Sequence, residues 1–275
     1  MTDVSLILPF ADEACTRVER AGGKGASLAA MTAAGLRVPP GYAIDAAALA
    51  AAVDTDRLRE LARARDHEGA EALVAAAEPP REAIAAAYAD LGAGSVAVRS
   101  SACAEDSETA SFAGQQETYL HVSGEADVCA RVVDCWASFF SERALFYREQ
   151  KGSLDDLAMA VVVQRMVDPD VAGVLFTVDP VQRRRDRMIV EAVRGIGEQV
   201  VSGEVTPDHY VVDRKGVRKR AKLVAAEGVL DDEQLAELAA LGVALEERFG
   251  CPQDIEWAIA GGEVYLLQSR PVTTL

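Results

Sequence analysis

The chain has 275 residues, of which half are apolar and 26% are charged, as expected of a water-soluble globular protein with a sizeable core. Its net charge of −16 disfavours nonspecific binding to nucleic acid or to an anionic membrane, so a site for a polyanion would have to be locally basic. The apolar runs are too short to cross a bilayer and the N-terminus does not resemble a signal peptide, so we expect a cytoplasmic protein. The five cysteines are an odd number without a CxxC pair, which favours reduced thiols over zinc ligands.

The sequence begins with a predicted strand from Val4 to Phe10, and helical composition follows from residue 26 to residue 34, ending at Gly35. The cluster Gly22-Gly23-Lys24-Gly25 directly precedes this helix. Glycines let backbone N–H groups approach a phosphate closely, and the start of a helix adds positive potential. The spacing is not that of a Walker A loop, and a structural turn with an exposed lysine is the alternative interpretation.

An alanine-rich segment comes next. A short strand is predicted from Tyr42 to Ile44, and the sequence up to about Leu91 predicts several helices. We expect breaks between these helices at Asp54, at Gly69 and at Pro79-Pro80.

A buried strand is predicted from Ser95 to Arg99. An arginine on a core strand is costly unless its charge meets a partner. Arg99 is therefore either half of a structural ion pair or a phosphate ligand at the end of the strand. The segment from Ser100 to Gln116 is small and polar and predicts a loop, which could either cover phosphates or be a plain surface loop.

The second half of the sequence is richer in strands. A helical pattern runs from Gly124 to Gln150, and an amphipathic helix is predicted from Asp231 to Phe249. Predicted strands cover residues 117–122, 160–167, 173–178, 188–192, 210–213 and 217–223. This order predicts an α+β protein with a boundary between two lobes near Gln164 to Pro169.

The chain closes with a predicted hairpin, whose strands are joined by the turn Gly261-Gly262. Simple alternation places Asp254 and Glu256 on one face of the first strand. In the second strand it places Gln268 and Arg270 on one face, together with Val264 and Leu266. The hairpin would set Glu256 beside Gln268 and Arg270. Carboxylate and amide oxygens bind a hard divalent cation and a guanidinium grips phosphate, although an ordinary surface ion pair is the alternative.

Taken together, these segments resemble the N-terminal nucleotide-binding domain of the phosphoenolpyruvate synthase and pyruvate phosphate dikinase family, which includes rifampin phosphotransferase. The resemblance runs in the family's order from residue 22 to residue 274 and so covers nearly the whole chain. Its blocks are GGKGASLAAMTAAGLRVPPGYAI, VAVRSSACAEDSETASFAGQQETYL, VVVQRMVDPDVAGVLFTVDP, IVEAVRGIGEQVVSGEVTPDHYVVD and DIEWAI with VYLLQSRPVT.

The resemblance implies a two-lobed ATP-grasp fold of the α+β class, with an alanine-rich helical N-terminal region. It implies one nucleotide-binding domain over residues 1–275, with lobe one at roughly 1–163, lobe two at roughly 164–275, and ATP between the lobes. The implied ligands are ATP and Mg²⁺, since phosphoryl transfer depends on positioning and charge neutralisation.

The family's site residues can be carried over to matching positions. Lys24, Arg99 and Arg270 would act in catalysis by contacting phosphates. Glu256 and Gln268 would bind Mg²⁺. The remaining nucleotide contacts would be a loop over the β- and γ-phosphates, with Gly114, Gln115 and Thr118, and the adenine pocket, with Gln164, Met166 and Val167.

The sequence departs from the family in two respects. Full-length members carry a mobile domain whose histidine takes the β-phosphoryl group, whereas this sequence ends just after SRPVT, and none of its three histidines is in a setting suited to that role. Arg194 stands where many relatives have an aromatic residue. We therefore expect a phosphotransfer component that forms AMP and phosphate, with a separate phosphohistidine-domain protein as its partner.

Two other functions remain open. A self-contained kinase or ligase would pass the γ-phosphate directly to a small-molecule acceptor and release ADP. A nucleotide sensor without catalysis is the third possibility, and the intact set of Lys24, Arg99, Glu256, Gln268 and Arg270 argues against it.

Overall fold

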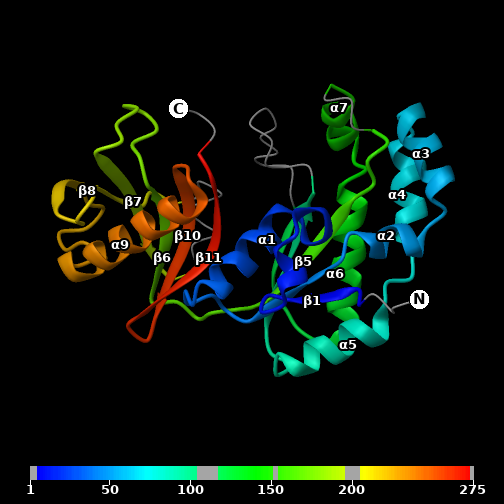
Figure 1. Cartoon of the computed structure of the whole chain (residues 1–275), viewed down its shortest axis with the longest axis horizontal. Helices are drawn as coiled ribbons and strands as arrows, with labels where there is room; N and C mark the ends of the chain where they lie inside the picture. The colour runs from blue at the N-terminus through cyan, green and yellow to red at the C-terminus, as the bar shows by residue number, and fades with distance from the viewer. Residues whose placement is uncertain (1–4, 104–116, 151–153, 196–204, 273–275) are drawn as a thin grey trace. The chain divides into compact units, whose positions relative to one another are not determined.

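The structure is a computed structural model that describes residues 5–103, 117–150, 154–195 and 205–272. It divides into two compact units (Figure 1). Unit 1 comprises residues 1–35 and 40–166, and unit 2 comprises residues 36–39 and 167–275. Each unit combines helices with an antiparallel sheet, so the predicted α+β class is confirmed. No helix in these described ranges is long and apolar enough to span a membrane.

Unit 1 contains a five-stranded sheet with the strand order β1-β2-β5-β3-β4. Its strands are β1 (Ile7–Pro9), β2 (Gly41–Ile44), β3 (Val96–Ala102), β4 (Thr118–Val122) and β5 (Met159–Arg165). Neighbouring strands are antiparallel throughout this order. The prediction of a loop from Ser100 onward was wrong for Ser100 to Ala102, because β3 continues through these residues, paired with β5.

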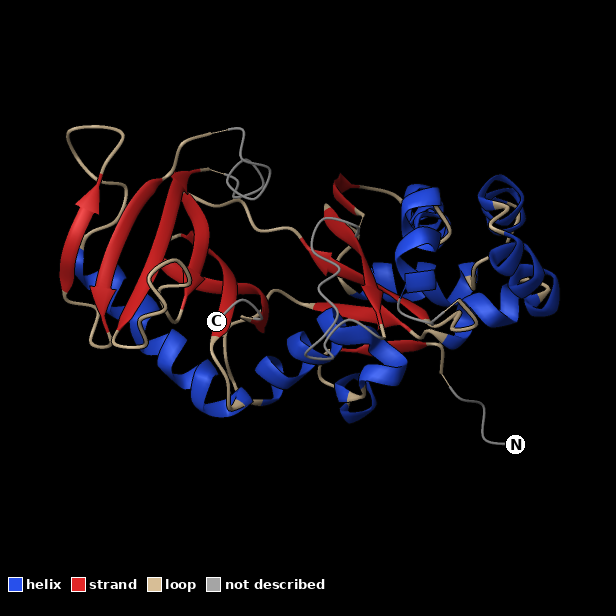
Figure 2. Ribbon diagram, turned by 90° about the horizontal axis from the view of Figure 1, so that it is seen from above, coloured by secondary structure: helices blue, strands red, loops and turns tan. Residues whose placement is uncertain are grey.

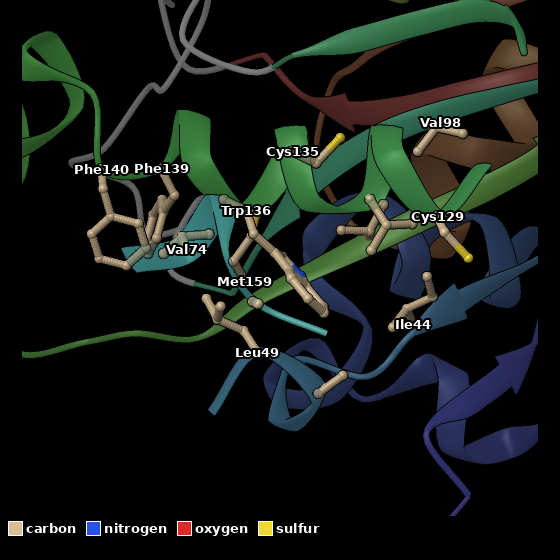
Figure 3. Packing of buried hydrophobic residues seen from close by; sticks show 14 of the residues in the cluster. Ile44, Leu49, Val74, Val98, Cys129, Cys135, Trp136, Phe139, Phe140 and Met159 are labelled. Atoms are coloured by element: carbon tan, nitrogen blue, oxygen red, sulfur yellow. The ribbon is translucent and has the colours of Figure 1, made fainter. Parts of the chain in front are cut away.

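The two faces of this sheet are covered by different helices. Helix α1 (Val18–Ala33), which follows the short 3-10 helix η1 (Glu13–Thr16), packs on β3, β5 and β2. On the other face, α6 (Glu125–Ser138) brings the fully buried Trp136 into the main core. Figure 3 shows Trp136 close to Met159 of β5 and Leu49, which lies on α2. The sheet thus has the main core on its α6 face and supports α1 on the other.

The alanine-rich segment is helical, as predicted. Its helices are α2 (Ala47–Ala52), α3 (Thr55–Ala64), α4 (His67–Ala75) and α5 (Arg81–Asp90). The break at Asp54 is confirmed, since its carboxylate accepts hydrogen bonds from the first N–H groups of α3. The break predicted at Gly69 was wrong. That break lies at Asp66, whose carboxylate caps α4 by accepting from the Gly69 N–H at 2.9 Å.

The helical pattern predicted from Gly124 to Gln150 is two helices, α6 and α7 (Glu142–Gln150). The buried guanidinium of Arg148 on α7 donates to the carbonyl oxygens of Phe139 and Leu154, each at 3.2 Å. Its charge lies over the ring of Phe139, 3.9 Å from the centroid. Burial lowers the pKa of Arg148 to about 10. This side chain therefore ties the end of α6 to the segment that leads into β5.

Unit 2 contains a six-stranded sheet with the order β11-β10-β6-β7-β8-β9, visible from above in Figure 2. Its strands are β6 (Val171–Phe176), β7 (Arg187–Arg194), β8 (Asp208–Asp213), β9 (Arg218–Lys222), β10 (Gln253–Ala260) and β11 (Glu263–Pro271). Helix α9 (Asp232–Phe249) packs on β10, β6 and β8. It starts with a capping box between Asp231 and Gln234 and ends at Gly250, close to the predicted bounds.

Candidate functional site

The glycine–lysine cluster lies inside α1, not before a helix as the sequence predicted. Gly22 interrupts the helix with φ 67° and ψ 173°, a conformation that is essentially restricted to glycine. Helical geometry resumes with Gly23, Lys24 and Gly25, so these residues still form the first turn of a helical stretch. A Cβ atom on Gly22 would lie 2.1 Å from the carbonyl oxygen of Ser101 on β3. The close approach of α1 to β3 therefore requires glycine at this position.

Lys24 and Arg99, the two predicted phosphate contacts of unit 1, lie near the same strand. The half-buried Lys24 donates from Nζ to the carbonyl oxygen of Ser100 at 2.9 Å. Arg99 lies on β3, is 7% exposed and pairs in register with Thr118 on β4. Cross-strand partners point to the same face of a sheet, so Arg99 and the exposed Thr118 share one face. The structure thus brings Lys24 of α1 against β3, the strand that carries Arg99 and pairs with Thr118 of β4.

The other predicted nucleotide contacts of unit 1 are more scattered. Gln164 is buried on β5, opposite Ala97 and Gly41, and therefore lies on the same face of the sheet as Arg99. Met166 follows the end of β5, and its N–H donates to the carbonyl oxygen of Ser95. Val167 is the first residue of the next segment of unit 2. Gly114 and Gln115 lie outside the described residues, so their role stays a prediction.

In unit 2, the terminal hairpin brings Glu256 and Gln268 directly opposite each other. A β-bulge makes this pairing possible. Trp257 pairs with Leu266 while Glu256 pairs with Gln268, so Leu267 is the extra residue of β11. The expectation that Leu266 shares a face with Gln268 was therefore wrong. The bulge turns Leu266, 1% exposed, to the same side as Trp257, and turns Gln268 to the side of Glu256.

Asp254 and Arg270 form the next cross-strand pair on the same face of the hairpin. The guanidinium donates from Nε and Nη2 to one oxygen of Asp254, at 2.9 and 2.8 Å. The alternation of the sequence predicts this face for Asp254, but its contact with Arg270 is evident only from the structure. Burial raises the pKa of Asp254, and the neighbouring Glu256 adds to this effect, while Arg270 opposes it. The half-exposed Arg270 is thus oriented beside Glu256 and Gln268, the two predicted metal ligands.

The row of residues across the sheet from Glu256 contains a second polar pair. Glu256 is opposite Val174 on β6, Val174 is opposite Glu191 on β7, and Glu191 is opposite His209 on β8. The ring nitrogen Nδ1 of His209 lies 3.2 Å from Oε1 of Glu191. Glu191 lies on β7, within the strand predicted over residues 188–192, and shares a face with Glu256. Among the described residues, no group of three or more His, Cys, Asp and Glu side chains is placed to hold a metal ion without other ligands.

Unit 1 also contains a pocket of about 720 Å³ between α4, β4, α6 and α7. Its lining includes the carboxylates of Glu68, Glu71, Glu117 and Asp134, with Arg143 as the basic side chain. None of the predicted site residues that the structure describes lines it. Because the carboxylates would repel a polyphosphate, we do not assign ATP to this pocket.

A comparison with models of known protein families shows which family the chain belongs to. The model of the pyruvate phosphate dikinase AMP/ATP-binding domain matches residues 18–227 and 215–275. The chain belongs to this family. A probable phosphoenolpyruvate synthase from Archaeoglobus fulgidus is 41% identical, covering 98% of this chain and 42% of the relative. A rifampicin phosphotransferase from a Streptomyces species is 39% identical, covering 98% of this chain and 36% of the relative.

The chain therefore spans about two fifths of the length of the dikinase-family relative from Archaeoglobus. Among solved structures, D-alanyl-alanine synthetase A from Vibrio cholerae aligns with 13% identity and a TM-score of 0.38, over 91% of this chain and 55% of that chain. That likeness is too low to decide the fold. The family match confirms the resemblance recognised in the sequence, and its description as an AMP/ATP-binding domain supports ATP as a ligand.

Proposed function

We propose that this chain is the ATP-binding component of a dikinase-like phosphotransferase with an ATP-grasp fold. It would use Mg²⁺ and ATP, pass the β-phosphoryl group to a histidine on a separate domain or protein, and form AMP and phosphate with consumption of water. The observation that carries the proposal is the polar face of the terminal hairpin, where Glu256, Gln268, Asp254 and Arg270 meet in a chain that matches an AMP/ATP-binding domain.

The proposed metal ligands suit Mg²⁺ chemically. Glu256 and Gln268 supply one carboxylate and one amide oxygen from directly opposed positions. Mg²⁺ commonly takes one or two protein oxygens and completes its octahedron with phosphate oxygens and water. When bound, the cation would neutralise the negative charge that develops on the phosphates.

The remaining proposed residues would bind and orient the nucleotide. Arg270, held by Asp254, presents its guanidinium as a fork for phosphate oxygens. Lys24 and Arg99 would contribute positive charge from unit 1, which a chain with a net charge of −16 needs for binding a polyanion. Gln164, Met166 and Val167 would contact the adenine, as the resemblance to the family implies.

The experiment that tests this proposal uses ATP labelled at the β-phosphate. The purified chain and Mg²⁺ are added to a desalted extract of the source cells, with Glu256→Ala as the inactive variant and Glu263→Ala as a matched control. Glu263 lies on the same hairpin and is exposed, paired with Arg37. We expect acid-labile label on a second protein and AMP formation. Glu256→Ala or Lys24→Ala should cost about 3 kcal/mol of transition-state stabilisation, typical for one preorganised electrostatic contact.

The other outcomes discriminate between the remaining functions. ADP formation that depends on Glu256 and on added small metabolites, without labelled protein, would replace the proposal with a self-contained kinase or ligase. Equal activity of the wild type and Glu256→Ala would reject the assignment of the hairpin to catalysis, and the absence of ATP binding would reject the function altogether.

A further inference from the structure

The break in α1 leaves backbone N–H and carbonyl groups next to Lys24 without their usual partners within the helix. When a helix is interrupted, the first N–H groups after the break have no carbonyl oxygen one turn earlier, and the last carbonyl groups before it lose their donors. Gly22 interrupts α1 in this way, between Ala21 and the turn that carries Lys24 and Gly25. Both sides of the break are buried, because Ala21, Gly22, Gly23 and Gly25 are all buried residues. Polar backbone groups in such a place must be satisfied by the protein itself.

The hydroxyl group of Ser101 forms a hydrogen bond to a backbone group on each side of the break. Its Oγ donates to the carbonyl oxygen of Ala21 at 2.8 Å and accepts from the N–H of Gly25 at 3.2 Å. Ser101 is fully buried on β3. One side chain, 80 residues away from Ala21 in the sequence, thus acts as a cap for the helical stretch after the break and as a donor to the stretch before it.

The neighbouring residue of β3 holds the side chain of the same turn. The carbonyl oxygen of Ser100 accepts from Nζ of Lys24 at 2.9 Å. An ammonium group has three donors, so this contact is compatible with contacts to phosphate oxygens. The strand therefore fixes Lys24 twice, through its side chain at Ser100 and through the backbone of its turn at Ser101.

We propose that Ser101 is a positioning residue for the phosphate contact made by Lys24. Its hydroxyl bridges the break in α1 and holds the first turn after Gly22 against β3, so that the ammonium group of Lys24 is presented from one fixed place. The inference rests on the proposed function. A charged contact that is displaced by about 1 Å loses much of its effect on a bound polyphosphate, which is why a residue without ligand contact can control binding.

A double-mutant cycle tests this role. The affinity for Mg²⁺ with the β,γ-imido analogue of ATP is measured by calorimetry for the wild type, Ser101→Ala, Lys24→Ala and the double variant. Ser138→Ala is the matched control, because it removes a serine–carbonyl hydrogen bond of the same 2.8 Å length from α6 of the same unit. We expect Ser101→Ala to weaken binding about tenfold, in line with a hydrogen bond whose loss leaves buried groups unsatisfied. Ser138→Ala should stay within about twofold of the wild type.

The decisive comparison is between the affinity of the double variant and that of Lys24→Ala alone. If Ser101 acts through Lys24, adding Ser101→Ala to Lys24→Ala should weaken binding no further, whereas independent effects would multiply. Multiplying effects, or equal affinities of Ser101→Ala and Ser138→Ala, would overturn the inference. A normal affinity of Lys24→Ala would instead reject Lys24 as a phosphate contact, and with it this part of the proposed function. If Ser101→Ala does not fold, Ser101→Cys under reducing conditions takes its place in the cycle, since a thiol keeps a weak donor and acceptor.

Discussion

Replacing Gly22 by alanine should destabilise unit 1 far more than the same change at Gly35. Both glycines have a positive φ, 67° and 73°, so both substitutions strain the backbone, and the ψ of 173° at Gly22 adds to this strain. A Cβ atom on Gly35 would meet nothing within 4 Å, whereas on Gly22 it would lie 2.1 Å from the Ser101 carbonyl oxygen and 2.3 Å from its Oγ. The first of these contacts is backbone and cannot rotate away, so α1 would have to move from β3 by about 1 Å or more.

The magnitudes follow from these contacts. Alanine at Gly35 should cost about 1 kcal/mol for the left-handed conformation alone. At Gly22 the same change adds overpacking and the loss of the two hydrogen bonds made by Ser101, and we expect about 4 kcal/mol in total. The Gly22 variant should also bind ATP more weakly, because the turn with Lys24 moves with α1.

Tryptophan fluorescence can report on unit 1 alone. The chain has two tryptophans, Trp136 in the core of unit 1 and Trp257 in unit 2, both fully buried. In a Trp257→Phe background, urea unfolding followed through Trp136 gives the free energy of unfolding of this unit for the Gly22 and Gly35 variants. Values within about 1 kcal/mol of each other would refute the reasoning, because the contact with Ser101 would then have no energetic consequence.

Two further changes test the packing of unit 1 with the same assay. Arg148→Met should cost about 4 kcal/mol, since it removes the donor to the buried carbonyl group of Phe139 and to the part-buried carbonyl group of Leu154, whereas Arg57→Met on the exposed surface should cost less than about 0.5 kcal/mol. Equal costs for the two arginines would contradict the structure. Burial raises the pKa of Cys15 from 9.0 to about 12, so between these values the folded chain keeps a proton that the unfolded chain releases. The free energy of unfolding should therefore fall as the pH rises above 9. Cys15→Ala should lessen this fall by about 1.4 kcal/mol per pH unit. If the dependence of the unfolding free energy on pH is the same in the variant, the thiol ionises in the folded state.

The parts of the fold that the sequence predicted well are those specified by local interactions. Helix α9 is bounded by a capping box at Asp231 and by Gly250 with φ 72°, and both signals lie within a few residues of the ends they define. The terminal hairpin turns at Gly261-Gly262, where both residues have positive φ. The break predicted at Gly69 was wrong because a local signal can have two meanings. A glycine can end a helix, or it can donate its N–H to a capping residue such as Asp66.

The site features that the sequence did not predict depend on contacts between distant segments. The break at Gly22 is stable because Ser101 bonds to both sides of it, across 80 residues of sequence. From residues 22–25 alone, a helix that starts after the glycines is the simpler interpretation. The sequence after the glycines has the same helical pattern whether or not another helical stretch precedes them. The role of Asp254 as the partner of Arg270 was likewise hidden, because it depends on the register of two strands.

The bulge at Leu267 explains how an apolar core and a polar site can share one short strand. In a regular strand Leu266 and Gln268 would point to the same side, so either a leucine would join the polar face or the glutamine would enter the core beside Trp257. One extra residue shifts the alternation between them, and each reaches the environment that suits it. The energetic preference of Leu266 for the core therefore helps to place Gln268 opposite Glu256. Packing on one face of the sheet thereby fixes the register of the candidate metal ligands on the other.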